Sequence, residues 1–201
     1  MKIYAVILAA GQGSRMGDVK QLLELGGKPV IRWVAEAACA ARLDGVIVVL
    51  GAEGAQVAKA LTGLRLTVVQ NEAWLSGQAS SLRCALDALP DDCAAVLFLL
   101  ADQPLLDASL LERLVKHYRK SGGATVAPAY QGRRGNPVLF DLKHWRTALL
   151  GLSGDEGARA LLADQEAIEL VEVEDETVFD DLDTPQDYER MKLIWRRWRR
   201  S

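Results

Sequence analysis

Five short apolar runs constrain the fold of this chain more than any other feature of its sequence. They lie at residues 3–9, 46–50, 66–70, 96–101 and 124–129. Each run is continuously apolar rather than alternating with polar residues, which is typical of strands buried on both faces of a sheet. Stretches with helical spacing lie between and after them, at 29–43, 54–64, 78–89 and 107–123. This alternation predicts an α/β fold: a single Rossmann-like domain of three layers, with a mostly parallel central sheet and helices on both faces.

Local signals mark several boundaries of these elements. Pro29 occupies a first-turn position, Asp107 is a candidate N-cap and Gly122 is a candidate helix end. After about residue 130 the pattern changes, because "QGRRGNPVLF" places a basic, glycine-bearing turn before a short strand. The stretch "LSGDEGARALL" predicts a turn that leads into a helix. We find no repeat or linker that divides the chain, so we expect one domain over residues 1–201.

Composition narrows the classes of partner. The formal net charge of −3 gives no reason to expect nucleic acid, and no apolar run reaches the roughly 18 residues of a membrane helix. We interpret the start of the chain as a first strand rather than a signal peptide, because its charged segment is short and a glycine-rich loop follows. Cys39, Cys84 and Cys93 show no metal-binding or disulfide spacing. We therefore expect a cytoplasmic protein without membrane or nucleic-acid partners.

The glycine-rich stretch "LAAGQGSRMG" behind the first strand indicates phosphate binding, and three chemistries compete for it. A dinucleotide loop needs its third glycine one residue earlier than Gly17 and a helix that begins there. A P-loop needs Gly-Lys-Ser/Thr, which "GGKP" does not provide. In the third interpretation, Gly11 and Gly13 let the backbone wrap a triphosphate while Arg15 and Lys20 add positive charge. The alternative without a ligand is a surface turn with solvated cations.

Acidic residues follow the strand at 96–101 and recur near the end of the chain. Asp102 stands at the carboxyl end of that strand, where ligands bind in parallel sheets and where Mg²⁺ is held by carboxylates and substrate phosphates. The alternative is that Asp102 only caps the next turn. The stretch "FDDLDTPQDY" adds Asp180, Asp181 and Asp183 just before a helix that opens on proline. A role in starting that helix is the alternative, and we favour it for Asp187.

Seven stretches in order resemble one known family. They are "LAAGQGSRMG", "KQLLELGGKPVI", "NEAWLSGQASSLRCAL", "LLADQPLL", "GRRGNPVLF", "GDEGARALL" and "DLDTPQDY". From Ile3 to about Tyr188 the chain resembles the molybdenum cofactor nucleotidyltransferases, and within that family it most resembles the cytidylyltransferase branch. The resemblance implies a fold of the nucleotide-diphospho-sugar transferase type. It also implies that residues 1–102 mainly bind nucleotide and residues 103–201 mainly bind the acceptor.

The resemblance further implies a Mg²⁺-dependent reaction between CTP (or GTP) and molybdenum cofactor, also called molybdopterin with its metal. The terminal phosphate of the cofactor attacks the α-phosphorus of the triphosphate, pyrophosphate leaves, and a dinucleotide form of the cofactor remains. Such chemistry needs alignment and charge neutralisation rather than a covalent protein intermediate. A molybdoenzyme that receives the product is an expected further partner.

The site residues that the resemblance implies fall into three groups. Arg15 and Lys20 would be the catalytic cations on the phosphates, and Asp102 and Asp183 would bind Mg²⁺. The acceptor would contact Arg134, Asn136, Asp155 and Arg159. The nucleotide would contact Leu8, Ala9, Ala10, Gly11, Gly13, Asn71, Gly77, Ser80 and Ser81, in addition to both cations.

Two positions bear on specificity. The guanylyltransferase relatives tend to have glycine at the position of Ala10, and a methyl group there favours the smaller pyrimidine, so we expect CTP. Many relatives carry histidine at the position of Asn136, which puts any proton transfer by this residue in doubt. Asparagine still donates and accepts hydrogen bonds.

Other functions remain open from the sequence. One is a guanylyltransferase, or a nucleotidyltransferase of the same fold that acts on a phosphosugar, a phosphoalcohol or another small phosphate. A second, of a different class, is a non-catalytic factor that delivers the cofactor to an apo-enzyme. The tail "KLIWRRWRRS" either packs Trp195 and Trp198 on the domain as a last helix or docks on an acidic surface of the recipient enzyme.

Overall fold

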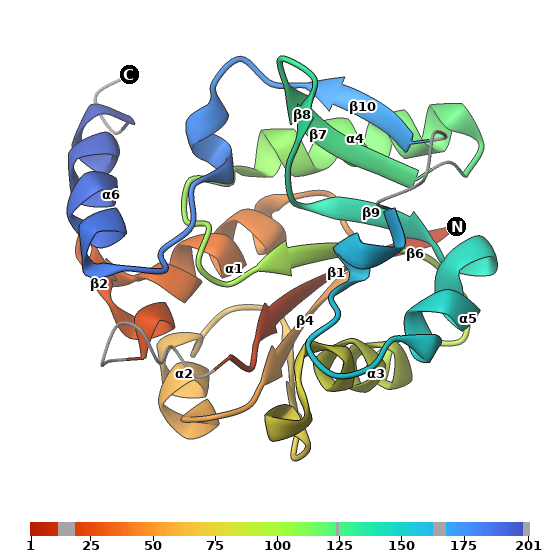
Figure 1. The fold of residues 1–201 in the computed structure, drawn as a ribbon, viewed down its shortest axis with the longest axis horizontal. Helices are drawn as coiled ribbons and strands as arrows, with labels where there is room; N and C mark the ends of the chain where they lie inside the picture. Colours follow the sequence, from red (N-terminus) through yellow and green to blue (C-terminus); the bar gives the residue numbers. More distant parts are fainter. Residues whose placement is uncertain (12–18, 124, 163–167, 199–201) are drawn as a thin grey trace.

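The computed structural model describes residues 1–11, 19–123, 125–162 and 168–198 (Figure 1). Its central sheet has the strand order β10-β7-β9-β6-β1-β4-β5, with β8 paired to β7. The strands of this sheet are β1 (Lys2–Ala9), β4 (Gly45–Leu50), β5 (Thr67–Gln70), β6 (Cys93–Leu100), β7 (Thr125–Tyr130), β8 (Arg133–Arg134), β9 (Val138–Asp141) and β10 (Ile168–Glu172). A separate hairpin consists of β2 (Glu24–Leu25) and β3 (Lys28–Pro29).

Six α-helices and four 3₁₀-helices accompany the strands in the described ranges. The α-helices are α1 (Val30–Ala40), α2 (Gly54–Ala60), α3 (Gln78–Ala88), α4 (Ala108–Ser121), α5 (Leu142–Gly151) and α6 (Pro185–Trp198). The 3₁₀-helices are η1 (Lys20–Leu22), η2 (Trp74–Ser76), η3 (Ala158–Leu162) and η4 (Glu176–Phe179). Within these ranges, no helix combines the length and the apolar character that crossing a bilayer requires.

The central strand β1 shows why its sequence is apolar without interruption. It pairs in parallel with β4 and β6, so Ile7 lies between Val48 and Leu99. The side chain of Ile7 enters a core under α1, α2 and α4, whereas that of Val6 enters a core under α3 and α5 on the opposite face (Figure 1). Both faces are therefore covered, as the continuous apolar runs predict. The predicted α/β domain with three layers and a mostly parallel sheet is confirmed.

β9 is the strand that interrupts the parallel order. It is antiparallel to β6, with Val138 opposite Phe98 and Asp141 opposite Ala95. The start of β9 therefore lies at the edge where β1, β4 and β6 end. The basic turn that precedes β9 therefore lies at this edge. For the parallel strands β1, β4 and β6, it is the segment after each strand that lies there.

Side chains at helix ends confirm several local predictions. The carboxylate of Asp107 accepts the N–H of Leu110 at 2.8 Å, and Gly122 ends α4 in the left-handed region with φ 77°. At the start of α6 the N–H of Thr184 donates to Asp187 at 2.9 Å and the N–H of Asp187 donates to the Thr184 hydroxyl at 3.2 Å. Asp187 thus serves the helix start, as we favoured. The helix predicted within "LSGDEGARALL" is only the short 3₁₀-helix η3.

A third, smaller core joins α6 to the β2–β3 hairpin, and we call it the C-terminal clasp. Its buried residues are Leu25, Val30, Leu105, Leu182, Met191 and Trp195. The ring of Trp195 lies 4.4 Å from that of Trp33 and covers Gly26, where any Cβ would overlap the indole. Figure 1 shows α6 beside β2 at one edge of the molecule. Trp195 therefore packs on the domain, while the last three residues of the tail lie outside the described ranges.

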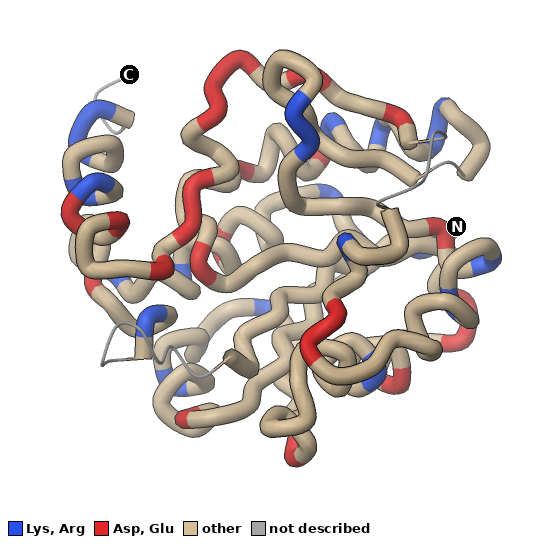
Figure 2. The backbone as a smooth tube through the Cα atoms, viewed as in Figure 1, with Lys and Arg blue, Asp and Glu red and all other residues tan. Residues whose placement is uncertain are grey.

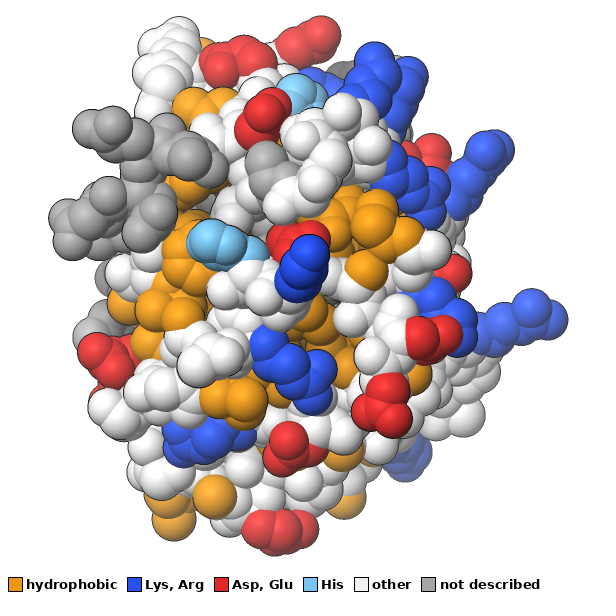
Figure 3. Space-filling model, turned by 90° about the vertical axis from the view of Figure 1, so that its right-hand side faces the viewer, with side chains coloured by type: hydrophobic (Ala, Val, Ile, Leu, Met, Phe, Trp, Pro, Cys, Tyr) orange, Lys and Arg blue, Asp and Glu red, His pale blue; other side chains and the backbone are white. Residues whose placement is uncertain are grey.

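Neither the face drawn in Figure 3 nor the three cysteines indicate a further reactive site. On the face shown in Figure 3, Lys and Arg side chains are interspersed with Asp and Glu and with small apolar areas. All three cysteines are free thiols, and burial raises the pKa of Cys39, Cys84 and Cys93. A raised pKa keeps a thiol protonated, so these cysteines lack the environment of an activated nucleophile.

Candidate active site

A cavity of about 460 Å³ opens at the carboxyl ends of β1 and β6. Its wall is formed by Leu8, Ala10, Gly11, Lys20, Gln21, Trp74, Leu75, Gly77, Gln78, Ser81, Leu100, Ala101, Asp102 and Asp155. We call it the nucleotide cavity, because eight of these residues are ones for which the sequence predicts contact with nucleotide, metal or acceptor. Ala9, Asn71 and Ser80 do not line it, and Gly13 and Arg15 lie outside the described residues.

A compact ion-pair cluster joins three distant parts of the chain at this cavity. Lys20 Nζ lies 2.5 Å from Asp102 Oδ2 and 2.7 Å from Asp183 Oδ1. Only 17% of the Lys20 side chain and 13% of the Asp102 side chain are exposed. Burial lowers the pKa of Lys20, but the two carboxylates outweigh this effect and the pKa is raised overall. Lys20 is therefore a fixed cation at neutral pH, held by both acids that the sequence predicts as metal ligands.

Asp102 keeps one oxygen available for a ligand. Its Oδ1 is buried and has no hydrogen-bond partner among the described residues, while Oδ2 is taken by Lys20. In the described part of the chain, no group of three or more His, Cys, Asp or Glu side chains is arranged to hold a metal ion. Two converging carboxylates with a free oxygen still suit Mg²⁺, which takes one or two carboxylates together with substrate phosphates. The donor set of Asp102 and Asp183 therefore fits a hard divalent cation.

The loop that connects β5 to α3 is held by hydrogen bonds between Asn71 in the loop and serines in the first turn of α3. Asn71 Nδ2 donates to Ser80 Oγ at 2.8 Å and to Ser81 Oγ at 3.0 Å, and Asn71 Oδ1 accepts the N–H of Ala73 at 3.0 Å. Ser80 Oγ donates to the carbonyl of Gly77 at 2.8 Å. Asn71 and Ser80 thus brace the loop, whereas Gly77 and Ser81 reach the cavity wall.

Six residues of the wall were not predicted, and two of them, Leu100 and Ala101, are the last residue of β6 and the residue after it. Gln21 follows Lys20 in η1 and donates through Nε2 to the Gly11 carbonyl at 3.1 Å, while its buried Oε1 has no partner among the described residues. Trp74, Leu75 and Gln78 lie on or after η2. Leu75 is 79% exposed, which is unusual for leucine. The signal for η2 was the pair of large apolar residues inside an otherwise polar loop.

A second loop packs against this one without any side chain between them. Gly77 has φ 99°, and a Cβ there would overlap the backbone of Gly154 and lie 2.7 Å from the N atom of Asp155. The N–H of Ala79 also donates to the Gly154 carbonyl at 3.0 Å. We call residues 154–162 the bridging segment, because it places Asp155 at the nucleotide cavity and continues to Arg159 at a second one.

The second cavity, of about 220 Å³, is formed by Gln103, Arg133, Arg134, Gly135, Asn136, Arg159, Phe179 and Asp181. We call it the basic cavity. It brings together three of the four predicted acceptor residues, and the fourth, Asp155, lies at the nucleotide cavity instead. Burial lowers the pKa of Arg134, and the nearby charge of Arg159 lowers it further. Two guanidinium groups held near each other in this way favour an anionic occupant.

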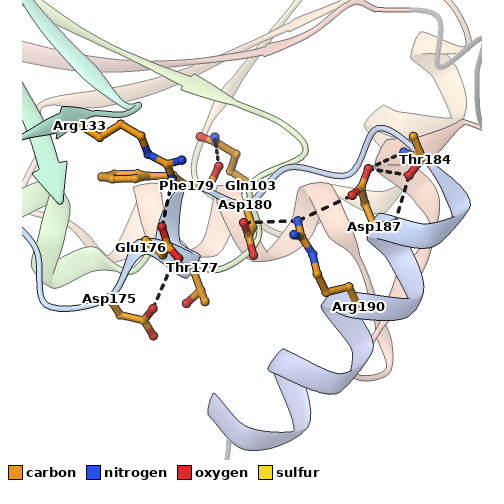
Figure 4. Close-up of polar contacts among 10 residues, drawn as sticks. All are labelled: Gln103, Arg133, Asp175, Glu176, Thr177, Phe179, Asp180, Thr184, Asp187 and Arg190. Carbon is orange, nitrogen blue, oxygen red and sulfur yellow. Dashed lines mark hydrogen bonds and ion pairs between the residues drawn. The ribbon is translucent and has the colours of Figure 1, made fainter. Parts of the chain in front are cut away.

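The two cavities adjoin through consecutive residues, because Asp102 lines one and Gln103 lines the other. Asp181 lines the basic cavity, yet its pKa is raised by burial and then by the charges of Asp102 and Asp183. The acids of "FDDLDTPQDY" therefore have different surroundings. Asp183 pairs with Lys20, whereas Asp180 pairs with Arg190 at 3.4 Å near the start of α6 (Figure 4). Figure 2 shows the red Asp and Glu positions along the segment that leads into α6.

Gln103 and Phe179 are further residues that the sequence did not single out. Gln103 is 3% exposed and its Nε2 donates to the Phe179 carbonyl at 3.1 Å (Figure 4). Gly135 packs on the ring of Phe179, where a Cβ would come within 2.7 Å of Cγ. The signal for Gln103 was its place directly after Asp102 at the end of a buried strand.

Comparison of the sequence with known proteins identifies the family of the chain and several relatives. Residues 5–170 match the family model described as MobA-like NTP transferase domain. The chain is 31% identical over 198 residues to the nicotine blue oxidoreductase of Paenarthrobacter nicotinovorans, covering 94% of this chain and 96% of that protein. It is 38% identical over 127 residues to the bifunctional protein GlmU of Trichlorobacter lovleyi, covering 61% of this chain. The chain spans about a quarter of that GlmU, since the match covers 27% of its length.

Solved structures agree with this assignment. Rv0371c from Mycobacterium tuberculosis has a TM-score of 0.84 and 28% identity, over 96% of this chain and 98% of that one. The same protein in complex with manganese has a TM-score of 0.79, over 96% and 99% of the two chains. A nucleotidyl transferase from Methanothermobacter thermautotroptrophicus has a TM-score of 0.83 and 27% identity, over 98% of each chain. The chain therefore belongs to the MobA-like NTP transferase family.

Proposed function

We propose that the chain is a Mg²⁺-dependent nucleotidyltransferase that transfers CMP from CTP to the phosphate of molybdenum cofactor and releases pyrophosphate. The observation that carries this proposal is the junction of the two cavities. Lys20 and Asp102 line one cavity, with Asp183 paired to Lys20, and the arginines Arg134 and Arg159 line the other. A nucleotide and an anionic acceptor bound there would meet next to Asp102. Residues 1–102 then mainly serve the nucleotide and residues 103–201 mainly the acceptor.

The nucleotide cavity supports a preference for a pyrimidine. Ala10 lines it, and the backbone of Ala10 packs closely on Gly51. A Cβ on Gly51 would lie 2.5 Å from the Ala10 carbonyl oxygen and 2.8 Å from Trp74 Cβ, so these three residues are already in close contact. With the Ala10 backbone packed in this way, a base placed against the Ala10 methyl group would disfavour the larger purine. This is the basis on which we propose CTP rather than GTP.

Lys20 and the two acids supply the charge neutralisation that phosphoryl transfer needs. Asp102 and Asp183 would hold the Mg²⁺, which when bound offsets negative charge on the phosphates. Lys20 would bind the phosphate that is attacked and stabilise its developing charge, assisted by Arg15. The manganese complex of the relative Rv0371c supports a divalent metal in this family. The high pKa of the thiols supports direct transfer without a covalent protein intermediate.

The basic cavity supports an acceptor that carries phosphate. Arg134 and Arg159 would bind the phosphate and point its attacking oxygen toward the α-phosphorus of the nucleotide. Asn136 would donate or accept a hydrogen bond. Asp155 would lie at the nucleotide side of the junction. The sequence around these residues is what favours a pterin phosphate over a sugar phosphate.

The test is pyrophosphate release with Mg²⁺ and freshly loaded molybdenum cofactor, with CTP, GTP, ATP and UTP compared in parallel. We expect cofactor-dependent release with CTP alone. The variant Asp102→Asn should lose turnover by about 10²- to 10³-fold, whereas Asp87→Asn, the same change at an exposed position of α3, should be unaffected. Release with GTP would overturn the base preference. Release only with a sugar phosphate would overturn the acceptor, and cofactor binding without any turnover would favour a delivery factor.

A second candidate function follows from the full-length similarity to nicotine blue oxidoreductase. It would be an oxidation or reduction, for which a nicotinamide dinucleotide is a common electron carrier. In the described residues, the first α-helix after the glycine-rich stretch begins only at Val30, whereas a dinucleotide loop leads directly into its helix. We therefore place this function second. Consumption of NADH or NADPH with nicotine blue, in the absence of pyrophosphate release with any nucleotide, would reverse the order.

A further inference from the structure

Gln103 is a buried polar side chain whose amide nitrogen is hydrogen-bonded and whose amide oxygen has no partner in the described part of the chain. Its Nε2 donates to the Phe179 carbonyl at 3.1 Å, but its buried Oε1 has no partner among the described residues. A buried amide oxygen without a partner destabilises the protein, so such groups are rare unless a ligand completes them. Gln103 lines the basic cavity, which is where a ligand would complete it.

The orientation of this amide is set by its partner. A carbonyl oxygen only accepts hydrogen bonds, so the Phe179 carbonyl requires the nitrogen of Gln103 to face it. Figure 4 shows the nitrogen on that side and the oxygen turned away from Phe179. Phe179 is itself held in place, because its ring fills the space that a side chain at position 135 would need. Gln103 lines the cavity, and this bond to Phe179 fixes the orientation of its amide and leaves Oε1 as an unused acceptor.

The rest of the basic cavity limits what can approach this acceptor. Arg134 and Arg159 favour an anion, and Arg134 Nε is buried without a hydrogen-bond partner in the described part of the chain. Arg134 Nη2 is engaged with the Leu162 carbonyl at 3.1 Å. A ligand that matches this wall carries an anionic group for the arginines and an N–H or O–H donor for Gln103. Because Gln103 follows Asp102, that donor would sit close to the reacting phosphate.

We propose that Gln103 determines acceptor specificity: its Oε1 accepts a hydrogen bond from an N–H or O–H of the organic part of the acceptor. The inference rests on the proposed function, of which it specifies the acceptor class as a phosphomonoester with such a donor. An acceptor without the donor leaves Oε1 buried and unsatisfied, which disfavours it by about 5- to 100-fold. Gln103 selects the substrate and takes no part in the chemical step.

The experiment compares two acceptors in two proteins. Molybdenum cofactor offers several N–H donors, whereas methyl phosphate has none on its organic part. Dissociation constants are measured for both in the wild type and in Gln103→Leu, with Gln56→Leu as a control on the exposed face of α2. In Gln103→Leu we expect the preference for the cofactor to fall by about 5- to 100-fold, while methyl phosphate affinity stays within about twofold.

The other possible results would each overturn or retain the role proposed for Gln103. An unchanged preference in Gln103→Leu would overturn it, and so would a parallel loss for both ligands with a lower melting temperature, which would make Gln103 structural. If the wild type prefers a sugar phosphate to methyl phosphate and ignores the cofactor, the proposed function fails. The inference then stands if Gln103→Leu abolishes that preference, and falls if it does not. Binding of neither cofactor nor sugar phosphate by the wild type would overturn both.

Discussion

Replacement of Trp195 by alanine tests whether the C-terminal clasp holds the two halves of the ion-pair cluster together. The segments that carry Lys20 and Asp183 both enter this small core within a few residues. Leu25 follows Lys20 through η1, and the fully buried Leu182 directly precedes Asp183. Tyr188 adds a hydrogen bond across the clasp, since its hydroxyl donates to the Glu24 carbonyl at 2.5 Å. Trp195 is 5% exposed and is the largest side chain in the clasp.

The magnitude follows from the area that Trp195 buries. A buried tryptophan removes about 150–250 Å² from water, and at about 25 cal/mol per Å² this corresponds to roughly 4–6 kcal/mol as an upper limit. Truncation of buried aromatic residues typically costs about 3–5 kcal/mol. We expect a loss near the lower end, because α6 lies at the edge of the molecule and can partly collapse onto Trp33.

Urea unfolding measures this loss, and Trp198→Ala provides the matched control. Trp198 is 38% exposed, with its ring 5.2 Å from that of Trp195, so its truncation should cost about 1 kcal/mol or less. The milder variant Trp195→Phe keeps most of the packing and should retain Mn²⁺ binding, whereas Trp195→Ala should weaken it. Equal and small losses of stability in both alanine variants would refute the reasoning. Unchanged Mn²⁺ affinity in a folded Trp195→Ala would refute the link to the site.

Two further predictions concern the loops around the cavities and the start of α6. Gly77→Ala should destabilise the protein by about 1–3 kcal/mol through its positive φ. The total loss should be larger, because the added Cβ meets the Gly154 backbone. Gly63→Ala is the control in thermal unfolding, since Gly63 has φ 88° with open space around it and should show the backbone strain alone. The hydrogen bonds from Thr184 lower the pKa of Asp187 below its ordinary 3.8. A lowered pKa stabilises the fold above pH 3.8, and this contribution is lost as the pH falls through the folded-state pKa. Asp187→Asn should therefore make the free energy of unfolding fall less steeply at acid pH. An unchanged acid dependence would contradict this.

The layout of the sheet and the place of Asp102 could be predicted because both follow from one-dimensional rules. Continuous apolar runs mark strands covered on both faces, and a carboxylate at the end of such a strand lies at the ligand edge. The direction of β9 could not be predicted, because a short apolar run reads the same in a parallel and an antiparallel strand. With β9 in that direction, Arg134 in β8 and Asn136 lie at the ligand edge just before β9 begins.

The hydrogen-bond partners of polar side chains could not be predicted from the sequence either. Asn71 lies in the loop after β5 and Ser80 in the first turn of α3. The sequence cannot distinguish a polar side chain that faces a ligand from one that braces this loop. Gln103 shows the converse, since an ordinary glutamine becomes notable only when its buried oxygen is seen without a partner. The predictions for Gly13 and Arg15 remain predictions, because these residues lie outside the described ranges.

The contact between Gly77 and Gly154 limits how such an enzyme can change its substrates. The bridging segment forms part of both cavity walls, with Asp155 in one and Arg159 in the other, and it rests on backbone rather than on a side chain that could be trimmed. Any substitution that widens the nucleotide cavity by moving this segment also displaces Arg159, which we propose binds the acceptor. Nucleotide and acceptor preferences should therefore shift together under selection, and engineering one alone would call for substitutions at Ala10 or Gln103, away from the bridging segment.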